Sequence, residues 1–453
     1  MSPLSTEELR AFVEAAMARP VTDLRRLPGG GRRQGWDVRL AGEDAGSRCF
    51  LRYDPSPLKP WDPYSLHREA DVYRALAGTK VPVARVLGVH PDAQAVLLSH
   101  EPGEPQFTAI GDPAYRAALQ DQLVDVLVDL HALDPRALDL RSLGEVGTIR
   151  EHLAEELDIW EGLYRHDAEP DPLLTASFRW LRDQAPGDDG RPSLVQGDTG
   201  PGNFLHQDGR ITAIVDWEFA HLGDPVEDLA WVSTRSVQEP LPNFAAFIGS
   251  YRQRSGRSAG AARLRYYRVL VELRIAVLGA RRRTERPAGG EVGNGLAFGS
   301  LHRKLLVEAL SDALDIELAP LAEPVPPPDP DDWLYREALD QLREVILPAV
   351  GDPFARLRTK GLARLVKHFR ATAQWRDANR SRTAADYGAL LGGTTAGLDD
   401  LRLDLERRLG AGDIAVHDAL PVLAREVQRE VAQAADVMGV LARRTFDPID
   451  NEE

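Results

Sequence analysis

The spacing of apolar residues separates the first hundred residues of the chain from the rest. Apolar and polar residues alternate within residues 21–53 and again at Val83–Val89 and Ala95–Ser99, which predicts strands. Two other segments, Thr6–Ala18 and Ser65–Ala77, repeat on a helical period instead. The pattern therefore predicts a β-rich N-terminal part that also contains two helices.

The helical period dominates from about Asp112 onward. The helices predicted before the next break are Tyr115–His131, Ile149–Tyr164, Leu173–Gln184, Asn243–Arg254, Ala261–Arg281 and Phe298–Leu314. Residues 319–332, APLAEPVPPPDPDD, contain too many prolines for a helix or a central strand, and they predict a semi-rigid linker. The helices predicted beyond the linker are Trp333–Val345, Pro353–Trp375, Leu398–Leu409 and Ile414–Arg444.

These patterns predict an α+β protein in four parts: a β-rich lobe at 1–101, a helical lobe at 102–318, the linker at 319–332 and a separate all-α domain at 333–453. No chemical motif lies beyond the linker. We therefore expect the last domain to be separable from the chemistry, folding alone or mediating association into a homo-oligomer. The alternative is that it covers an apolar face of the helical lobe.

Composition and charge narrow the class of protein. The 453 residues are 43% hydrophobic and carry a net charge of −15, which argues against a nucleic-acid partner. An acidic body suits a cationic acceptor, although solubility is the more usual reason for it. Cys49 is the only cysteine, so neither an internal disulfide nor a cysteine metal cluster can form. There is no apolar run long enough to span a membrane and no signal pattern at the N-terminus, so we expect a cytoplasmic protein.

The richest chemical signal is the stretch LVQGDTGPGNFLHQDGRITAIVDWEFAHLGDPVEDLAW, residues 194–231. Asp198 lies on a loop rich in glycine and proline, and Asn203 ends that loop. A tight turn at Asp208–Gly209 then predicts a hairpin whose second strand brings Asp216 back to the end that carries Asp198 and Asn203. Phosphoryl transfer from ATP needs one carboxylate to orient a hydroxyl and accept its proton, with an amide oxygen and a second carboxylate to hold Mg²⁺.

This stretch resembles the core of the aminoglycoside phosphotransferase and choline kinase-like family, distant relatives of protein kinases. The family pattern H-G-D-x₄-N, I-D-W/F-E and G-D-P-x-x-D-L-A corresponds to segments beginning at Gln196, Val215 and Gly223. The resemblance covers about residues 20–315. It implies a two-lobed protein-kinase-like fold with ATP and Mg²⁺ as cofactors, Asp198 as the catalytic base, and Asn203 and Asp216 as Mg²⁺ ligands.

The resemblance also assigns nucleotide-binding residues to the β-rich lobe. Arg52 stands where the family usually has a lysine that holds the phosphates, and Glu69 would be its ion-pair partner. Members associated with acyl-CoA dehydrogenases carry a similar Leu-Arg at this place. Gly30, in the triple-glycine turn, could approach the phosphates closely. Residues 97–101, which include Ser99 and Glu101, resemble the hinge whose backbone reads adenine.

Three residues of the catalytic stretch are expected to have structural roles. Gln196 replaces the usual histidine, which is structural in this family because it packs and hydrogen-bonds beneath the catalytic loop. Glutamine can hydrogen-bond but cannot titrate, so slower or altered chemistry is the expected cost. Asp224 and Asp228 are expected to brace the loop after the metal site and not to contact substrate.

The acceptor stays open between two chemical classes. A cationic, aminoglycoside-like acceptor would use acids of the helical insert: Glu151, Glu155, Glu156, Asp158 and Glu161. A hydroxyacyl-CoA would instead prefer the basic residues Arg281, Arg282 and Arg283. Both sets could equally be solvated helix faces. The alternative function is a catalytically impaired nucleotide-binding regulatory or scaffold module, which Gln196 and Arg52 suggest and the three intact catalytic positions oppose.

Overall fold

The structure of the protein is a computed structural model that describes residues 3–27, 33–57, 59–188, 190–285, 292–321 and 328–449. Its contacts form two compact units. The first unit comprises Met1–Ile159, Pro186–Tyr267 and Phe446–Glu453, and the second comprises Trp160–Ala185 and Arg268–Thr445.

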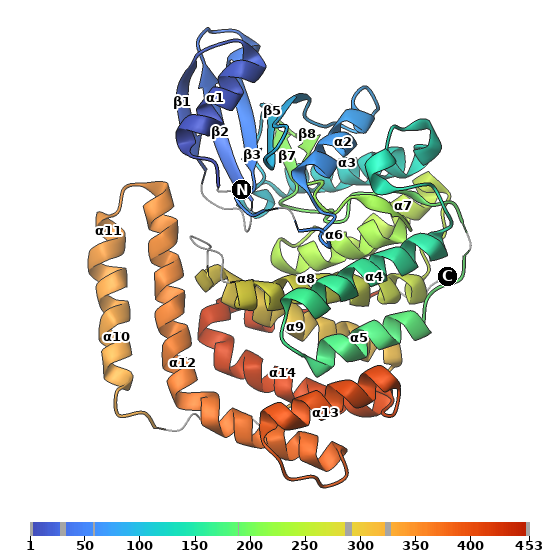
Figure 1. Ribbon diagram of the computed structural model, residues 1–453, viewed down its shortest axis with the longest axis vertical. Helices are drawn as coiled ribbons and strands as arrows, with labels where there is room; N and C mark the ends of the chain where they lie inside the picture. Colours follow the sequence, from blue (N-terminus) through green and yellow to red (C-terminus); the bar gives the residue numbers. More distant parts are fainter. Residues whose placement is uncertain are drawn as a thin grey trace. The chain divides into compact units, whose positions relative to one another are not determined.

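The first unit begins with a five-stranded antiparallel sheet in the order β1-β2-β3-β5-β4. Its strands are β1 (Val21–Arg26), β2 (Gln34–Leu40), β3 (Arg48–Tyr53), β4 (Val86–Val89) and β5 (Ala95–Ser99). Helix α1 (Thr6–Met17) lies against one face (Figure 1), where its Leu9 and Val13 pack with Val38, Cys49 and Leu51 of the sheet. Ser5 and Glu8 form a capping box at the start of this helix. These elements confirm the predicted β-rich lobe.

Strand alternation explains how β3 serves both the core and the site. Cys49 and Leu51 point into the core beneath α1. Neighbouring residues of a strand point to opposite faces, so Arg52 points away from that core. Helix α2 (Leu66–Leu76), capped by the Ser65 side chain, contributes Glu69 to the same place.

Two small antiparallel pairs follow in the first unit. Strands β7 (Phe204–Gln207) and β8 (Arg210–Ile214) form the predicted hairpin, and its turn residues Asp208 and Gly209 have φ values of 50° and 79°. Both values are left-handed, as a type I′ turn requires. Strand β6 (Ser193–Val195) pairs with β9 (His221–Gly223), a strand that the sequence pattern did not predict.

The helices of the first unit agree in place with the predicted ones, with one addition. They are α3 (Pro113–Ala132), the first part of α4 (Ile149–Asp167), α6 (Val226–Gln238), α7 (Phe244–Ser255) and the start of α8 (Ala261–Glu285). Helix α6 was not predicted, and its first turn carries the two buried acids Glu227 and Asp228. The short 3₁₀ segments are Ala45–Ser47, Phe107–Ala109, Pro135–Ala137 and Arg141–Leu143.

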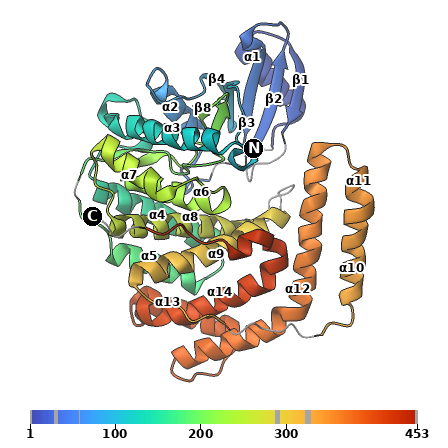
Figure 2. The ribbon, with the colours of Figure 1, turned by 180° about the vertical axis from the view of Figure 1, so that it is seen from behind.

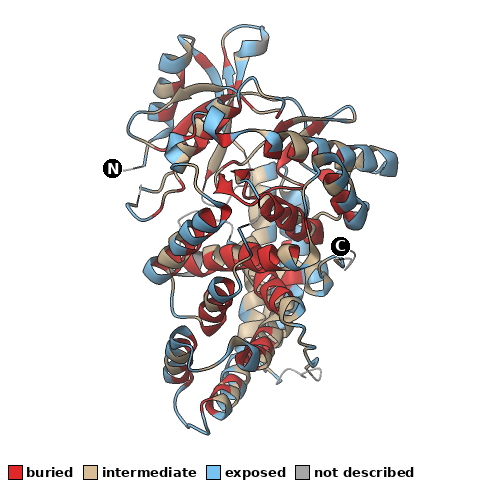
Figure 3. Cartoon of the chain, turned by 90° about the vertical axis from the view of Figure 1, so that its right-hand side faces the viewer, coloured by how far each residue is buried: buried red, intermediate tan, exposed pale blue. Residues whose placement is uncertain are grey.

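The described part of the second unit is helical. Its helices are α5 (Pro172–Asp183), most of α8, α9 (Val292–Leu314), α10 (Asp332–Asp340), α11 (Leu347–Ala349), α12 (Pro353–Leu390), α13 (Leu398–Ala411) and α14 (Val416–Met438), with a π-helical segment at Gln341–Ile346 and a 3₁₀ segment at Gly439–Arg443. Helix α14 packs on α9, and α13 packs on α5 (Figure 2). Most helices of the chain carry both buried and exposed residues (Figure 3). Leu405 of α13 and Leu420 of α14 are among the buried ones.

This division of contacts differs from the predicted boundary. We expected residues 333–453 to form a separate domain, but α10–α14 belong to one compact unit with α5 and α9. The buried carboxylate of Glu406 illustrates the reason, because it accepts hydrogen bonds from Tyr164 and Thr175 at 3.0 and 2.9 Å. Association of copies through this region stays a prediction. In the described part of the chain, every helix is too short or too polar to cross a membrane.

Candidate active site

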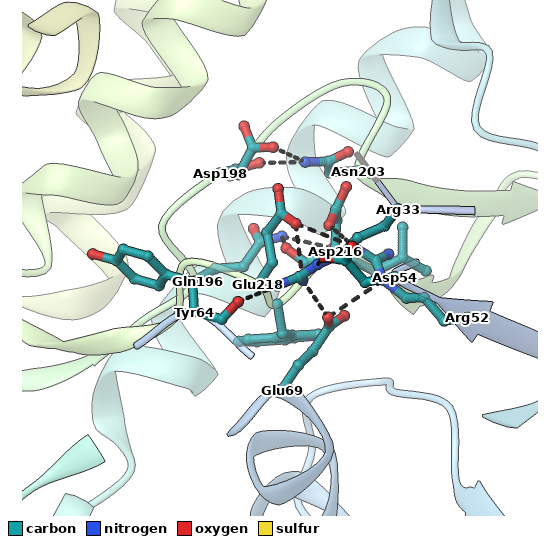
Figure 4. Close-up of polar contacts among 12 residues, drawn as sticks. Arg33, Arg52, Asp54, Tyr64, Glu69, Gln196, Asp198, Asn203, Asp216 and Glu218 are labelled. Atoms are coloured by element: carbon teal, nitrogen blue, oxygen red, sulfur yellow. Dashed lines mark hydrogen bonds and ion pairs between the residues drawn. The ribbon is translucent and has the colours of Figure 1, made fainter. Parts of the chain in front are cut away.

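The loop between β6 and β7 carries the first two candidate residues, Asp198 and Asn203. Gly197 precedes Asp198 with φ 79°, and a Cβ at this position would lie 2.4 Å from the carbonyl oxygen of Phe219. A glycine is therefore required, both for the left-handed backbone and for the close approach of the two segments. The loop delivers Asp198 and Asn203 as nearly buried side chains facing each other (Figure 4).

Asp198 is held by two partners. The Nδ2 of Asn203 donates to the Asp198 backbone oxygen at 2.8 Å and to its Oδ2 at 2.7 Å. Arg235 of α6 donates through Nε to Oδ1 of Asp198 at 2.8 Å and through Nη2 to its Oδ2. Burial raises the pKa of Asp198 to about 6, and the ion pair with Arg235 limits the rise. The carboxylate is thus fixed in orientation and has a pKa close to neutral.

Asp216 lies two residues beyond β8, at the end of the hairpin where Asn203 immediately precedes β7. The backbone N–H of Val215 donates to the Asn203 carbonyl at 3.0 Å and joins the two segments. Asp216 has φ 65°, a left-handed conformation that is uncommon for a residue other than glycine and is found at functional sites. Burial opposes its charge, but Arg52, with Arg33 and Arg235, outweighs that effect and holds the pKa of Asp216 below its usual value.

A second group of charged side chains surrounds Arg52 (Figure 4). Arg52 pairs with Asp216 through Nη2, and its Nε lies 3.3 Å from Oε2 of Glu69. The predicted Arg52–Glu69 pair is therefore present. The exposed fractions of the two side chains are 14% and 2%, which excludes an ordinary surface pair. Arg33, Glu218 and Asp54 also belong to the group. Arg33 lies 2.7 Å from Glu69, 2.8 Å from Glu218 and 3.9 Å from Asp54.

Gln196 takes a structural place beneath the loop. Its Nε2 donates to the Val215 carbonyl at 2.8 Å, immediately before Asp216. The buried Asp228 accepts from the backbone N–H groups of Gln196 and Gly197 at 2.9 and 3.1 Å. Asp224 caps the first turn of α6 by accepting from the Val226 N–H at 3.0 Å. Both acids therefore make structural contacts, but Asp228 braces the segment that carries Asp198 and not the loop after the metal site. That neither acid contacts substrate stays a prediction.

The predicted adenine hinge is only partly open to a ligand. The N–H of Ser99 donates to the Arg85 carbonyl at 2.8 Å, and its hydroxyl donates to Oε1 of Glu101 at 2.5 Å. Ser99 is thus engaged within the sheet, which leaves residues 100 and 101 as the remaining hinge positions. Gly30 lies outside the described residues. The nucleotide-binding roles of Ser99, Glu101 and Gly30 stay predictions.

Most of the candidate acceptor residues have structural partners. Glu156 accepts from the Tyr64 hydroxyl at 2.9 Å, and Glu161 pairs with Arg182 at 2.8 Å. Arg281 is buried and pairs with Asp167 at 2.9 Å, so it already has an anionic partner. Glu151 bonds the Thr148 N–H at the start of its helix, Glu155 pairs with His152, and the side chains of Arg282 and Arg283 lie outside the described residues.

Three charged residues of the site were not assigned a role from the sequence. Glu218 lies within the quoted motif, two residues after Asp216. Arg33 directly follows the glycine-rich turn, which was the available signal for it. Arg235 stands seven residues after Asp228, two turns along the same face of α6. That signal is visible only once α6 is known to be a helix.

The oxygen ligands at this end of the hairpin fit a magnesium ion in kind. The amide nitrogen of Asn203 faces Asp198, so its oxygen is directed elsewhere, and the Asp216 carboxylate lies on the adjoining segment. Carboxylate and amide oxygens are the protein ligands that Mg²⁺ uses. Among the described residues, no three His, Cys, Asp or Glu side chains gather in a way that could hold a metal. A magnesium ion would therefore depend on these two residues together with phosphate oxygens.

Comparisons with characterised proteins identify relatives that match somewhat less than half of the chain. Acyl-CoA dehydrogenase family member 10 of Mus musculus is 28% identical over 199 residues, covering 41% of this chain and 18% of that protein. Acyl-CoA dehydrogenase family member 11 of Gallus gallus is 28% identical over 205 residues, covering 42% of this chain and 26% of that protein. The matched region thus spans only a fraction of either relative's length.

Solved structures show the fold. A candidate aminoglycoside phosphotransferase from Ralstonia eutropha JMP134 has a TM-score of 0.52 at 22% identity, covering 69% of this chain and 99% of that one. The apo form of a thermostable mutant of aminoglycoside phosphotransferase APH(4)-Ia has a TM-score of 0.50 at 18% identity, with coverages of 67% and 98%. The fold is therefore α+β and protein-kinase-like, as predicted. The family model described as the phosphotransferase enzyme family, APH, matches residues 23–267, and with more than half of its chain covered the protein belongs to that family.

Proposed function

We propose that the protein is an ATP- and Mg²⁺-dependent phosphotransferase that phosphorylates a hydroxyl group of a small molecule. The observation that carries this proposal is the meeting of Asp198, Asn203 and Asp216 at one end of the β7–β8 hairpin, with Arg52 paired to Asp216. These are the residue types that positioning and charge stabilisation in phosphoryl transfer require. Membership of the phosphotransferase family supports the same reaction class.

Each residue has a distinct role in the proposed reaction. Asp198 accepts the proton of the acceptor hydroxyl, and a pKa of about 6 suits a base that works near neutral pH. Arg52 binds phosphate oxygens with its planar fork of donors. Asn203 and Asp216 would hold Mg²⁺, which when bound with ATP neutralises charge on the phosphates. Arg235 fixes both oxygens of Asp198 so that the base keeps one orientation.

For the acceptor, we propose a hydroxylated acyl-CoA as the first class to test. The support comes from relatives that match about two fifths of the chain, which are acyl-CoA dehydrogenase family members. An aminoglycoside-like acceptor is the second class, supported by the fold alone. The partners found for Glu156, Glu161 and Arg281 leave acceptor recognition to other residues.

A panel of hydroxyacyl-CoA compounds, hydroxylated metabolites and aminoglycosides would test the proposal. Each is incubated with the protein, ATP and Mg²⁺, and the products are analysed by mass spectrometry for the added phosphate. We expect one class to gain phosphate only when ATP and Mg²⁺ are both present. Absence of any phosphorylated product, together with absence of nucleotide binding by calorimetry, would contradict the proposal.

The second candidate is a nucleotide-binding regulatory module without efficient catalysis. The observations that favour it are Gln196 in place of histidine and the engagement of both Asp198 oxygens by Arg235. Tight nucleotide binding without turnover of any acceptor, and without ATP hydrolysis, would favour this candidate over the enzyme.

A further inference from the structure

Arg33 is a buried arginine that contacts three separate segments of the chain within the site. Its Nη1 lies 2.7 Å from Oε2 of Glu69 on α2 and 2.8 Å from Oε2 of Glu218 beyond β8. Its Nη2 donates to the Tyr64 carbonyl at 2.7 Å. The side chain is only 7% exposed, so these contacts are made in a poorly solvated place where charge interactions are strong.

Arg33 holds Glu69 more closely than Arg52 does. Both arginines approach the same oxygen of Glu69, but the Nε of Arg52 lies 3.3 Å away and makes no hydrogen bond. Arg52 instead directs Nη2 to Asp216 and lies 3.6 Å from Glu218. The familiar pairing of one cation with the α2 glutamate is therefore divided between two arginines here.

The charge balance around Arg52 explains why a second arginine matters. Three carboxylates, Glu69, Asp216 and Glu218, lie within ion-pair distance of Arg52. If Arg52 alone had to neutralise them, they would compete with nucleotide phosphates for its five donors. Arg33 lies closer to Glu69 and Glu218 than Arg52 does and so carries the larger share of neutralising these two carboxylates.

We propose that Arg33 is a positioning residue for nucleotide phosphates, which holds Glu69 and Glu218 so that Arg52 can bind the phosphate groups. This inference rests on the proposed function, because it assumes that a nucleoside triphosphate binds at Arg52. Arg33 forms no part of the family pattern on which the sequence resemblance stands. This role extends the phosphate-binding end of the site to Arg33, the residue immediately before β2.

The test compares binding of two probes, the β,γ-imido analogue of ATP with Mg²⁺ and adenosine, by calorimetry. Arg33→Gln should weaken binding of the ATP analogue about tenfold or more and leave adenosine binding unchanged, because only the analogue has phosphates. A merely structural defect would weaken both. Arg33→Lys restores the charge but not the fork, so it should recover only part of the affinity. Arg25→Gln is the matched control, because Arg25 is an exposed arginine of the same sheet that pairs with Asp37 at 3.5 Å. This variant should bind both probes like wild type.

A double variant that also removes a carboxylate gives a sharper test. Adding Glu218→Gln to Arg33→Gln removes one of the charges that Arg33 neutralises, so affinity for the ATP analogue should partly return. If Arg33→Gln binds the ATP analogue with wild-type affinity, this inference is wrong and the proposed function still stands. If Arg33→Gln does not fold, Arg33→Lys decides, and wild-type affinity in that variant overturns the inference. A wild-type protein that binds neither probe overturns the proposed function and this inference with it.

Discussion

Asp198 is the residue on which the proposed chemistry depends most directly. It is buried, hydrogen-bonded by Asn203 and paired with Arg235, and its pKa is raised to about 6. A carboxylate with this pKa is ionised at neutral pH and is still basic enough to accept a proton from a hydroxyl as phosphate is transferred. The same ion pair with Arg235 that orients Asp198 also keeps it ionised.

Replacing Asp198 by Asn should leave nucleotide binding nearly intact and reduce turnover by about 10²-fold or more, because the general base is lost while the shape is kept. Turnover is measured with the best acceptor found, and nucleotide affinity by calorimetry. Asp208→Asn, at the opposite end of the same hairpin, is the control and should behave like wild type. Turnover of Asp198→Asn at the wild-type rate would remove Asp198 from the base role.

Asp216 is the only acidic member of the proposed metal pair. Asp216→Asn removes its charge and keeps a residue type that tolerates the left-handed backbone at φ 65°. We expect Mg²⁺ to stop tightening the binding of a non-hydrolysable ATP analogue, while binding without Mg²⁺ is retained. Calorimetric titrations with and without Mg²⁺ make the comparison. Equal tightening by Mg²⁺ in the variant and in wild type would place the metal elsewhere.

At the scale of elements, the catalytic loop depends on its attachment to α6. Asp228 in the first turn of α6 accepts from the N–H groups of Gln196 and Gly197 and from the Thr199 hydroxyl at 2.6 Å. His131 of α3 donates to it at 3.1 Å. Burial opposes ionisation, but hydrogen bonds from His131, Thr199 and Gln196 hold the pKa of Asp228 below its usual value. One carboxylate therefore joins three segments of the first unit.

Asp228→Asn should destabilise this part of the protein by about 3 kcal/mol, because an amide replaces a buried, fully hydrogen-bonded charge. A lowered pKa means that the stabilising contribution is fully present above the unfolded pKa of about 4 and is lost as the pH falls through the folded pKa. Denaturation followed by circular dichroism at about pH 7 and about pH 3 should therefore show a large difference from wild type at the higher pH and a smaller one at the lower.

The control for Asp228 is Asp121→Asn, an exposed carboxylate whose pairing with Arg254 should contribute less than about 1 kcal/mol. If the Asp228 variant differs from wild type equally at both pH values, the effect is steric and the assignment of a charge contribution is wrong.

At the scale of the whole molecule, residues 333–445 complete a compact unit with helices that precede the proline-rich segment. Arg303 of α9 is buried and pairs with Asp171 before α5 and with Glu430 of α14, the latter at 2.7 Å. Leu305 and Leu310 of α9 are fully buried, and α14 packs on this helix. The expectation of a separable last domain is therefore replaced by the covering role.

A chain ending at Leu318 should be insoluble or aggregated, because it exposes the apolar residues that α14 and α13 cover and leaves Arg303 without Glu430. Soluble yield and size-exclusion chromatography measure the outcome, with a chain ending at Ile449 as the control. A soluble, monomeric truncated protein that unfolds cooperatively would restore the original expectation of an independent last domain.

The sequence by itself determined the parts of the site that are close together along the chain. Asp198, Asn203 and Asp216 lie within one loop and hairpin, and their spacing is sufficient to place them at one end of it. The strands of the β-rich lobe were also predicted, because strand alternation is a local property. The Arg52–Glu69 pair was expected from the family resemblance and is present in the structure. Family membership followed from the same short motifs.

The tertiary structure alone decided the contacts between distant segments. Arg33 contacts Glu218, which lies 185 positions away in the sequence. Arg235 contacts Asp198 from α6, a helix that was not predicted. The Glu406 carboxylate reaches Tyr164 in the same way, 242 residues apart. An amphipathic pattern indicates that a helix has an apolar face, but it does not indicate which other helix or sheet packs against that face. Partner choice depends on packing, and packing is settled only when the whole chain is folded.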